Sequence, residues 1–157
     1  MGDRFFYVER AGRLIDREIG AIVRSSSIYE SEPWGFEDDQ NFLNKVVEVD
    51  SDLQPTELLT KIHKIESELG RIRTGAGYEA RTIDIDILFY GNWIIIQNDL
   101  VIPHKHLPGR RFALTPLAEL VPELYHPVLA CKVQSILDRC KDKGEVKVVH
   151  ATRLAAH

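Results

Sequence analysis

Hydrophobic residues recur at helical spacing in the middle of the first half of the chain. Between about Thr56 and Leu69 they lie four, three and four residues apart, which puts them on one face of an amphipathic helix. Pro55 suits the start of this helix and Gly70 suits its end. The residues of the stripe are Leu58, Ile62, Ile65 and Leu69.

A second helix is predicted near the N-terminus, where Asp3 can cap a helix that runs to about Ile19. Further along, Phe112–Leu124 mixes helical and loop signals, and Cys131–Lys141 has a helical pattern. The apolar stripe of the N-terminal helix is expected to consist of Phe6, Ala11, Leu14, Ile15 and Ile19.

Strand patterns alternate with these helices along the chain, and the clearest of them is Thr82–Tyr90. Proline, glycine and acidic residues mark Pro33–Gln40, Arg71–Ala80 and Val101–Arg111 as loops or irregular segments. The alternation of helices and strands favours a mixed α/β fold. The other predicted strands are Ile22–Glu30, Phe42–Val49, Trp93–Ile96 and Glu145–Ala151.

The composition is that of a single globular domain over residues 1–157. The 20 Lys and Arg against 24 Asp and Glu give a net charge of −4, which disfavours a nucleic-acid partner. No apolar run approaches the roughly 20 residues of a membrane span, and Met1–Arg4 lacks the features of a signal peptide. We therefore expect a cytoplasmic protein. Cys131 and Cys140 are expected to be packing residues.

Two acidic residues alternate with isoleucines in the clearest strand. Since side chains alternate between the faces of a strand, the isoleucines are expected to point into the core and Asp84 and Asp86 to share the opposite face. The two carboxylates would lie roughly 6.6 Å apart along the strand, where like charges disfavour each other unless cations are near. Mg²⁺ suits this place, because it binds one or two carboxylates together with phosphate oxygens and water.

Basic residues flank this acidic pair on both sides in the sequence. Fixed cations beside carboxylates are typical of a polyphosphate site with metal ions. The alternative is an exposed strand face whose acids form surface salt bridges of little energetic value. His104 and His106 could also bind zinc, although no third ligand is evident. The basic residues are Arg71, Arg73 and Arg81 before the strand, and His104, Lys105, His106, Arg110 and Arg111 after it.

Other phosphate-binding motifs are absent from the sequence. There is no P-loop run, no G-x-G-x-x-G and no kinase catalytic motif. Several segments instead occur together in one order. Leu69–Arg73 and Tyr78–Leu88 hold the arginines and aspartates, Ser27–Gly35 has the form S-x-Y-x-S-x-P-x-G, and Gln40–Asn44 follows. Val101–His104, Arg110–Phe112 and Pro116-Leu117 complete the series.

Over roughly Gly2 to Pro127 these motifs resemble the 6-hydroxymethyl-7,8-dihydropterin pyrophosphokinase family of folate biosynthesis. The resemblance implies an enzyme that transfers pyrophosphate from ATP to the pterin hydroxymethyl group and releases AMP. It also implies an α/β (α+β) fold: a three-layer sandwich around a ferredoxin-like, mostly antiparallel sheet. An impaired paralogue that only binds pterin or nucleotide, and a metal-dependent phosphohydrolase, are the alternative functions.

The resemblance further implies a role for individual residues. Asp84 and Asp86 match two Mg²⁺ ligands, which would hold two ions. The catalytic arginines are Arg71, Arg73 and Arg81. The ATP contacts are His63, Glu66, Arg73, Arg81, Ile87, Leu100, His104 and Arg110. The pterin contacts are Ser31, Pro33, Trp34, Phe42, Asn44, Tyr78 and Phe112.

Two departures from the family pattern concern its first strand and its catalytic loop. Met1–Arg4 resembles only the end of the family's first turn, so about one strand is absent. Glu145–Ala151, from the same chain or from a partner, is predicted to fill the slot, and a mis-set start codon is the alternative explanation. A monomer is the default expectation, and a dimer that exchanges this strand is the alternative. Thr74–Gly77 stands where relatives often carry cations, and Glu79-Ala80 stands where they have Gly-Pro.

Overall fold

The computed structural model describes residues 2–32, 42–72 and 83–150 of the chain. The chain divides into two units. The first unit comprises Met1–Val23 and Glu48–Ile87, and the second comprises Arg24–Val47 and Leu88–His157. The prediction that the whole chain is a single domain stays a prediction.

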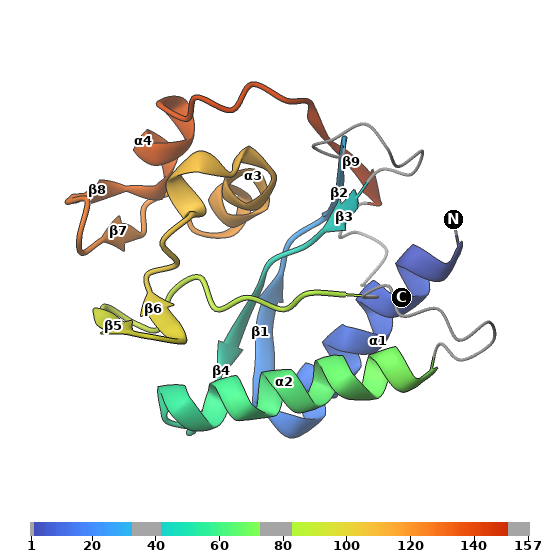
Figure 1. Cartoon of the computed structure of the whole chain (residues 1–157). Coiled ribbons are helices and arrows are strands. Elements are labelled where there is room, and N and C mark those ends of the chain that lie inside the picture. The colour runs from blue at the N-terminus through green and yellow to red at the C-terminus, as the bar shows by residue number, and fades with distance from the viewer. Residues whose placement is uncertain (1, 33–41, 73–82, 151–157) are drawn as a thin grey trace. The chain divides into compact units, whose positions relative to one another are not determined.

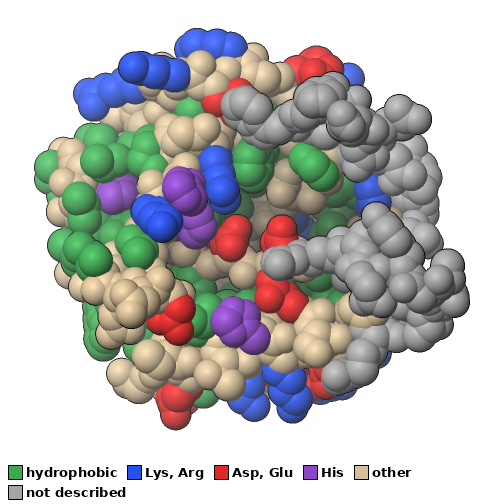
Figure 2. Space-filling view, viewed as in Figure 1, with side chains coloured by type: hydrophobic (Ala, Val, Ile, Leu, Met, Phe, Trp, Pro, Cys, Tyr) green, Lys and Arg blue, Asp and Glu red, His purple; other side chains and the backbone are tan. Residues whose placement is uncertain are grey.

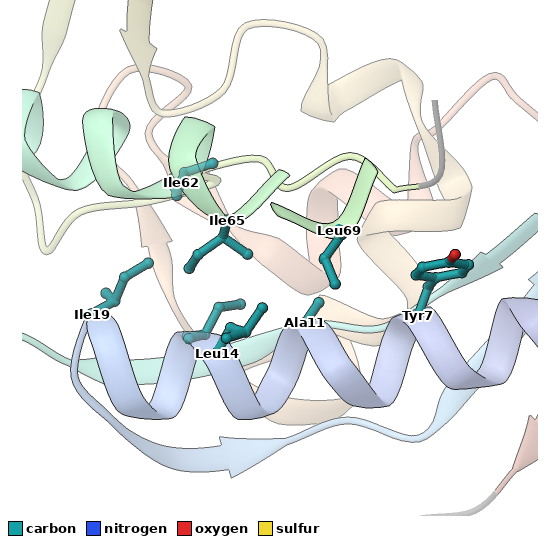
Figure 3. Close-up of a cluster of buried hydrophobic side chains, with 8 residues drawn as sticks. Tyr7, Ala11, Leu14, Ile19, Ile62, Ile65 and Leu69 are labelled. Carbon is teal, nitrogen blue, oxygen red and sulfur yellow. The ribbon is translucent and has the colours of Figure 1, made fainter. Parts of the chain in front are cut away.

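Two packed helices, α1 (Gly2–Glu18) and α2 (Pro55–Ile72), form the first unit's core (Figure 1). Figure 3 shows their side chains pointing toward one another, and Ile65 and Leu69 have no exposed surface. The predicted stripe of α2 is therefore confirmed. Partly buried isoleucines of the acidic segment, Ile83, Ile85 and Ile87, pack against the same cluster.

The predicted stripe of α1 was wrong at one position. Tyr7 is buried, whereas Phe6 is 49% exposed and packs only edge-on against the Tyr7 ring at 5.2 Å. Tyr7 lies four residues before Ala11 and so continues the helical spacing of the stripe, which Phe6 does not.

Strands β1 (Ala21–Ser25) and β4 (Val47–Asp50) pair in a two-stranded sheet and cross the boundary between the units in sequence. Gly20 precedes β1 at a close backbone approach, since a Cβ atom there would lie 2.2 Å from the carbonyl oxygen of Asp50. Beside it, Ser51 Oγ donates a hydrogen bond of 2.7 Å to the carbonyl of Ile19. Glycine is thus required where α1 turns into β1.

A three-stranded sheet in the order β3-β2-β9 lies in the second unit. Its strands are β2 (Ile28–Ser31), β3 (Phe42–Asn44) and β9 (Val146–His150), and both neighbours pair antiparallel with β2. The predicted C-terminal strand is therefore confirmed, and it pairs within its own chain. That it fills the slot of an absent family strand stays a prediction.

Helices α3 (Arg111–Leu120) and α4 (Val133–Asp138) supply most of the second unit's core. The α3 helix also packs against the three-stranded sheet (Figure 1). The remaining elements are the antiparallel pairs β5 (Ile95–Gln97) with β6 (Leu100–Ile102) and β7 (Tyr125–His126) with β8 (Cys131–Lys132), and the short 3-10 helix η1 (Leu107–Gly109).

Two predicted strands are each divided in the structure. Ile22–Glu30 is broken at Ser26 and Ser27, and Phe42–Val49 is broken before Val47. At the break Ser26 donates its backbone N–H to the carbonyl of Val46, while Ser26 Oγ accepts the N–H of Val46 at 2.9 Å. The serine hydroxyl replaces a ladder carbonyl, which is how serine competes with regular secondary structure.

The prediction of a strand at Thr82–Tyr90 was wrong for the described residues, since Ile83 to Tyr90 belong to no strand. The alternation of exposure is nevertheless as expected, with Asp84 and Asp86 exposed between partly buried isoleucines. The periodicity reports which side chains are buried, but not whether a neighbouring strand is present to pair with the backbone.

Smaller differences concern the C-terminal half. The strand expected at Trp93–Ile96 begins only at Ile95, and its partner β6 starts just before the stretch expected to be irregular. The helix expected at Cys131–Lys141 is limited to α4. The mixed α/β (α+β) class is confirmed.

Apolar side chains remain on the surface of the second unit. Figure 2 shows them gathered on the left of the view, over the β5–β6 and β7–β8 pairs. Exposed large hydrophobic residues there are Trp93, Ile94, Ile96, Tyr125, Val128 and Leu129. Among the helices described, none combines the length and the apolar character needed to cross a membrane.

His126 is a buried polar residue at the β7–β8 turn, with 4% exposure. Its Nδ1 accepts the backbone N–H groups of Val128 and Leu129 at 3.2 and 3.0 Å, and its ring meets Phe89 edge-on. Burial lowers the pKa of His126 below the usual 6.5. The neutral ring therefore closes this turn.

We predict that this histidine makes the protein less stable in mild acid. Because its pKa is lowered on folding, its contribution is complete above pH 6.5 and declines as the pH falls below 6.5, by up to about 1.4 kcal/mol per pH unit. His126→Asn keeps an acceptor near the Nδ1 position and does not titrate. Urea unfolding between pH 5 and 8 should show a smaller pH dependence in this variant, and equal slopes would contradict the prediction.

Candidate functional site

The acidic pair lies on a segment that the first unit's core holds in place. Asp84 and Asp86 are exposed, and the isoleucines between and beside them are partly buried against the α1–α2 cluster. Both carboxylates are therefore on the solvent side of the segment, as the sequence predicts. This arrangement leaves them accessible to a cation or to a phosphate-bound metal ion.

Glu66 fixes the backbone between the two aspartates. It projects from α2, and its Oε2 accepts the backbone N–H of Ile85 at 2.7 Å. A charged acceptor makes this a strong kind of hydrogen bond. His63, which is exposed, lies three residues earlier on α2 and so on a neighbouring part of the same helix face. Two residues assigned to the nucleotide thus lie on the helix that anchors the acidic segment.

The donor set fits Mg²⁺ better than zinc. In the described ranges, no group of three or more His, Cys, Asp or Glu side chains is placed to hold a metal ion. Structural zinc needs four such ligands and catalytic zinc three, whereas Mg²⁺ is commonly held by one or two carboxylates plus phosphate and water. An exposed pair of carboxylates satisfies the second requirement.

In the second unit, one face of the β3-β2 pair collects residues assigned to the pterin. Tyr29 is opposite Asn44 and Ser31 is opposite Phe42 in the register. Residues directly opposite share a face, as do residues two apart on one strand, so all four side chains lie on the same face. Ser31, Phe42 and Asn44 are therefore brought together.

Two of these residues have features of a binding surface. Ser31 is only 7% exposed, yet its Oγ has no hydrogen-bond partner among the residues that the structure describes. Phe42 is 47% exposed, which is high for a large aromatic side chain. A buried hydroxyl without a partner is costly, and a polar ligand edge would satisfy it.

The start of α3 carries two further candidates. The Arg110 guanidinium lies over the Phe112 ring, 5.8 Å from its centroid, within the range of a cation–π contact. Asp142 accepts the backbone N–H of Arg111 at 3.4 Å and that of Gly144 at 2.9 Å. A carboxylate from the C-terminal part of the chain thereby holds the first turn of this helix.

His104 and Leu100 occupy the segment that precedes α3. The His104 backbone N–H donates to the carbonyl of Leu88, and its Nδ1 accepts the backbone N–H of His106. Leu100 is buried in β6 and Ile87 is partly buried, which suits residues expected to meet a nucleotide through their backbone.

Other assigned residues lie outside what the structure describes. Pro33, Trp34, Arg73, Tyr78 and Arg81 fall in the gaps of the described ranges. Arg71 is in the last turn of α2, with its side chain outside the described set.

Sequence reasoning missed Glu119 and Tyr29. Glu119 on α3 accepts hydrogen bonds from Ser27 and from the Tyr29 hydroxyl, which lie about 90 residues away in the sequence. Burial, together with the hydrogen bond and the charge of Glu119, raises the pKa of Tyr29 to about 12. No local pattern marks such a pair, although Glu119 follows Phe112 by seven residues and so shares its helix face.

Comparison with known proteins gives one family. Residues 1–122 match the 7,8-dihydro-6-hydroxymethylpterin-pyrophosphokinase (HPPK) family. The chain is 41% identical over 128 residues to the 2-amino-4-hydroxy-6-hydroxymethyldihydropteridine pyrophosphokinase of Aquifex aeolicus, covering 82% of this chain and 79% of that protein. It is 40% identical over 125 residues to the protein of the same name from Bacillus subtilis, covering 79% and 74%.

A plant relative shows the same similarity within a longer protein. The chain is 40% identical over 121 residues to the folate synthesis bifunctional protein of Arabidopsis thaliana, which covers 77% of this chain and a quarter (25%) of that protein. The described site residues from Ser31 to Phe112 all lie inside the matched range.

We predict that Glu66 controls local opening of the acidic segment. In Glu66→Ala the Ile85 N–H loses a charged acceptor, so its amide hydrogen exchange should accelerate about tenfold, equivalent to ~1.4 kcal/mol. Glu66→Gln keeps an acceptor and should have a smaller effect. Glu68→Ala, two residues along the same helix, is the control, and NMR-detected exchange is the measurement. An unchanged Ile85 rate in Glu66→Ala would refute the anchoring role.

Proposed function

The chain belongs to the 7,8-dihydro-6-hydroxymethylpterin-pyrophosphokinase family, and we infer that it transfers pyrophosphate from ATP to the hydroxymethyl oxygen of 6-hydroxymethyl-7,8-dihydropterin. The products are AMP and the pterin diphosphate, an intermediate of folate biosynthesis. The observation that carries this proposal is the exposed Asp84 and Asp86 pair, anchored through Ile85 by Glu66 within the family-matched range.

The second unit supplies what a flat pterin needs. Such a ring binds between aromatic side chains, and its polar edge needs donors and acceptors in fixed positions. Phe42 and Phe112 are the proposed aromatic contacts. Asn44 can both donate and accept, and the unpartnered Ser31 Oγ adds one more polar group. Pro33, Trp34 and Tyr78 complete the proposed pterin contacts.

ATP would be bound mainly through its charge. We assign its phosphates to Arg110, His104 and the motif arginines, since guanidinium groups bind phosphate oxygens in a bidentate way. His63, Glu66, Ile87 and Leu100 are the other proposed nucleotide contacts. The arginines in the proposal are Arg71, Arg73 and Arg81.

Asp84 and Asp86 would hold two Mg²⁺ ions. When bound, these ions would neutralise phosphate charge during the transfer. The contribution of this chain's own residues is mostly positioning. Glu66 holds the aspartate segment, and Asp142 holds the helix start that carries Arg110 and Phe112. Correct placement of two substrates accounts for a large share of catalysis in phosphoryl transfer.

The cellular location and the oligomeric state are also part of the proposal. We propose a cytoplasmic location, which membership of a family of folate enzymes supports, and a monomer as the oligomeric state.

Product analysis tests the proposed reaction directly. Incubation of the protein with ATP, Mg²⁺ and the hydroxymethyl pterin should yield AMP and the pterin diphosphate in equal amounts, as measured by liquid chromatography and mass spectrometry. Binding of the pterin without AMP formation would instead indicate a binding paralogue. Release of inorganic phosphate in the absence of the pterin would indicate a phosphohydrolase.

The acidic pair should be essential for turnover and dispensable for folding. Asp84→Asn and Asp86→Asn each remove a charge that faces solvent, so we expect AMP formation to fall by at least about 100-fold with a melting temperature within ~3 °C of the wild type. Asp52→Asn, an exposed acid in the turn before α2, is the matched control. Retained turnover in either site variant would remove that residue from the metal site.

A further inference from the structure

We propose that Glu119 is a positioning residue for the pterin. Its carboxylate fixes strand β2 against helix α3, and these two elements carry opposing parts of the pterin site. This inference rests on the proposed function and extends it to a residue that has no expected contact with either substrate.

The Glu119 carboxylate accepts four hydrogen bonds, from Ser27 just before β2 and from Tyr29 within it. The Ser27 backbone N–H donates to both carboxylate oxygens at 3.1 and 3.2 Å, and Ser27 Oγ donates to Oε2 at 3.3 Å. The Tyr29 hydroxyl donates to Oε1 at 2.7 Å. Ser27 and Tyr29 are each 8% exposed, whereas the Glu119 side chain that accepts from them is exposed.

These bonds are made at the point where the strand is broken. Ser26 Oγ accepts the backbone N–H of Val46, which ends the regular ladder, and Glu119 accepts the next N–H along the chain, that of Ser27. The direction in which β2 leaves the break is therefore fixed by α3. The phenol of Tyr29, with its pKa raised to about 12, remains a hydrogen-bond donor across the physiological pH range.

The clamped strand leads directly to the proposed pterin contacts. Ser31 is two residues beyond Tyr29 on the same face, and Asn44 and Phe42 lie opposite these two residues. Phe112 is seven residues before Glu119, about 10 Å along the same face of α3. Glu119 thus determines how the aromatic contact on the helix is placed relative to the polar contacts on the sheet.

Other contacts hold α3 without holding β2. The Arg24 guanidinium donates to the carbonyl of Leu120 at the end of the helix, and Asp142 accepts from Arg111 at its start. Loss of Glu119 should therefore leave the helix formed while β2 shifts relative to it. Since a displacement of about 1 Å in a positioned group can reduce catalysis 100-fold, the effect should be measurable.

The test compares substrate affinities in variants of the full chain. In Glu119→Ala we expect the dissociation constant and KM for 6-hydroxymethyl-7,8-dihydropterin to rise about tenfold or more, while the dissociation constant for ATP changes less than twofold. Glu119→Gln keeps one acceptor for Ser27 and should recover most of the pterin affinity. Tyr29→Phe removes a single bond and should give an intermediate effect.

The control is Glu123→Ala, because Glu123 is exposed and forms a surface ion pair with Lys132, which is worth little to stability. The inference is overturned if Glu119→Ala binds the pterin as Glu123→Ala does. It is also overturned if pterin and ATP affinities fall together in proportion to a lower melting temperature. If Glu119→Ala does not fold, Tyr29→Phe and Ser27→Ala decide the question by the same criteria.

Hydrogen exchange separates this inference from the proposed function. Faster exchange of the Ser27 amide in Glu119→Ala, without any ligand, would show the clamp itself. A wild-type chain that shows this clamp and binds no pterin would refute the proposed function, and with it the positioning role. A wild-type chain that binds the pterin unaffected by Glu119→Ala would refute the inference alone.

Discussion

Buried backbone N–H groups must have acceptors, and where this chain leaves its regular ladders the acceptor is often a side chain. Glu66 accepts from Ile85, Glu119 accepts from Ser27, and Ser26 accepts from Val46. In the same way, Asp142 accepts a backbone N–H at the start of α3, and His126 accepts one in the β7–β8 turn. These bonds allow irregular backbone to stay in one conformation without a strand or helix partner.

The segments that these side-chain acceptors hold also lead to or contain the residues proposed for the reaction. Asp84 and Asp86 face solvent because the isoleucines between them are packed and Ile85 is bonded to α2. Ser31, whose buried hydroxyl has no hydrogen-bond partner among the described residues, lies on the strand that Glu119 contacts through Tyr29. In both units, one carboxylate that accepts hydrogen bonds from the backbone contacts a short segment that carries proposed substrate contacts.

Each unit carries some of the residues proposed as substrate contacts. The first unit presents acidic groups suited to metal-bound phosphate on a helix-supported segment. The second presents aromatic and neutral polar groups suited to a flat heterocycle, together with the basic residues His104 and Arg110.

Sequence periodicity was sufficient to predict the buried stripe of α2 and the exposure of Asp84 and Asp86. The reason is that the spacing of apolar residues indicates which side chains are buried. It also predicted the C-terminal strand. It failed where hydrogen bonding decided the outcome: the chain from Ile83 to Tyr90 alternates like a strand but belongs to none, and two serines divide a predicted strand at Ser26.

The sequence by itself determined the class of fold, the motif residues and the faces on which they lie. Only the tertiary structure decided that Glu119 bonds to Ser27 and Tyr29, and that Asp142 caps α3. The physical reason is the separation along the sequence. Periodicity describes residues within a few turns of each other, whereas a carboxylate about 90 residues from its donor leaves no local pattern. Such long-range acceptors are found only when the chain has folded and brought donor and acceptor within 3 Å or so of each other.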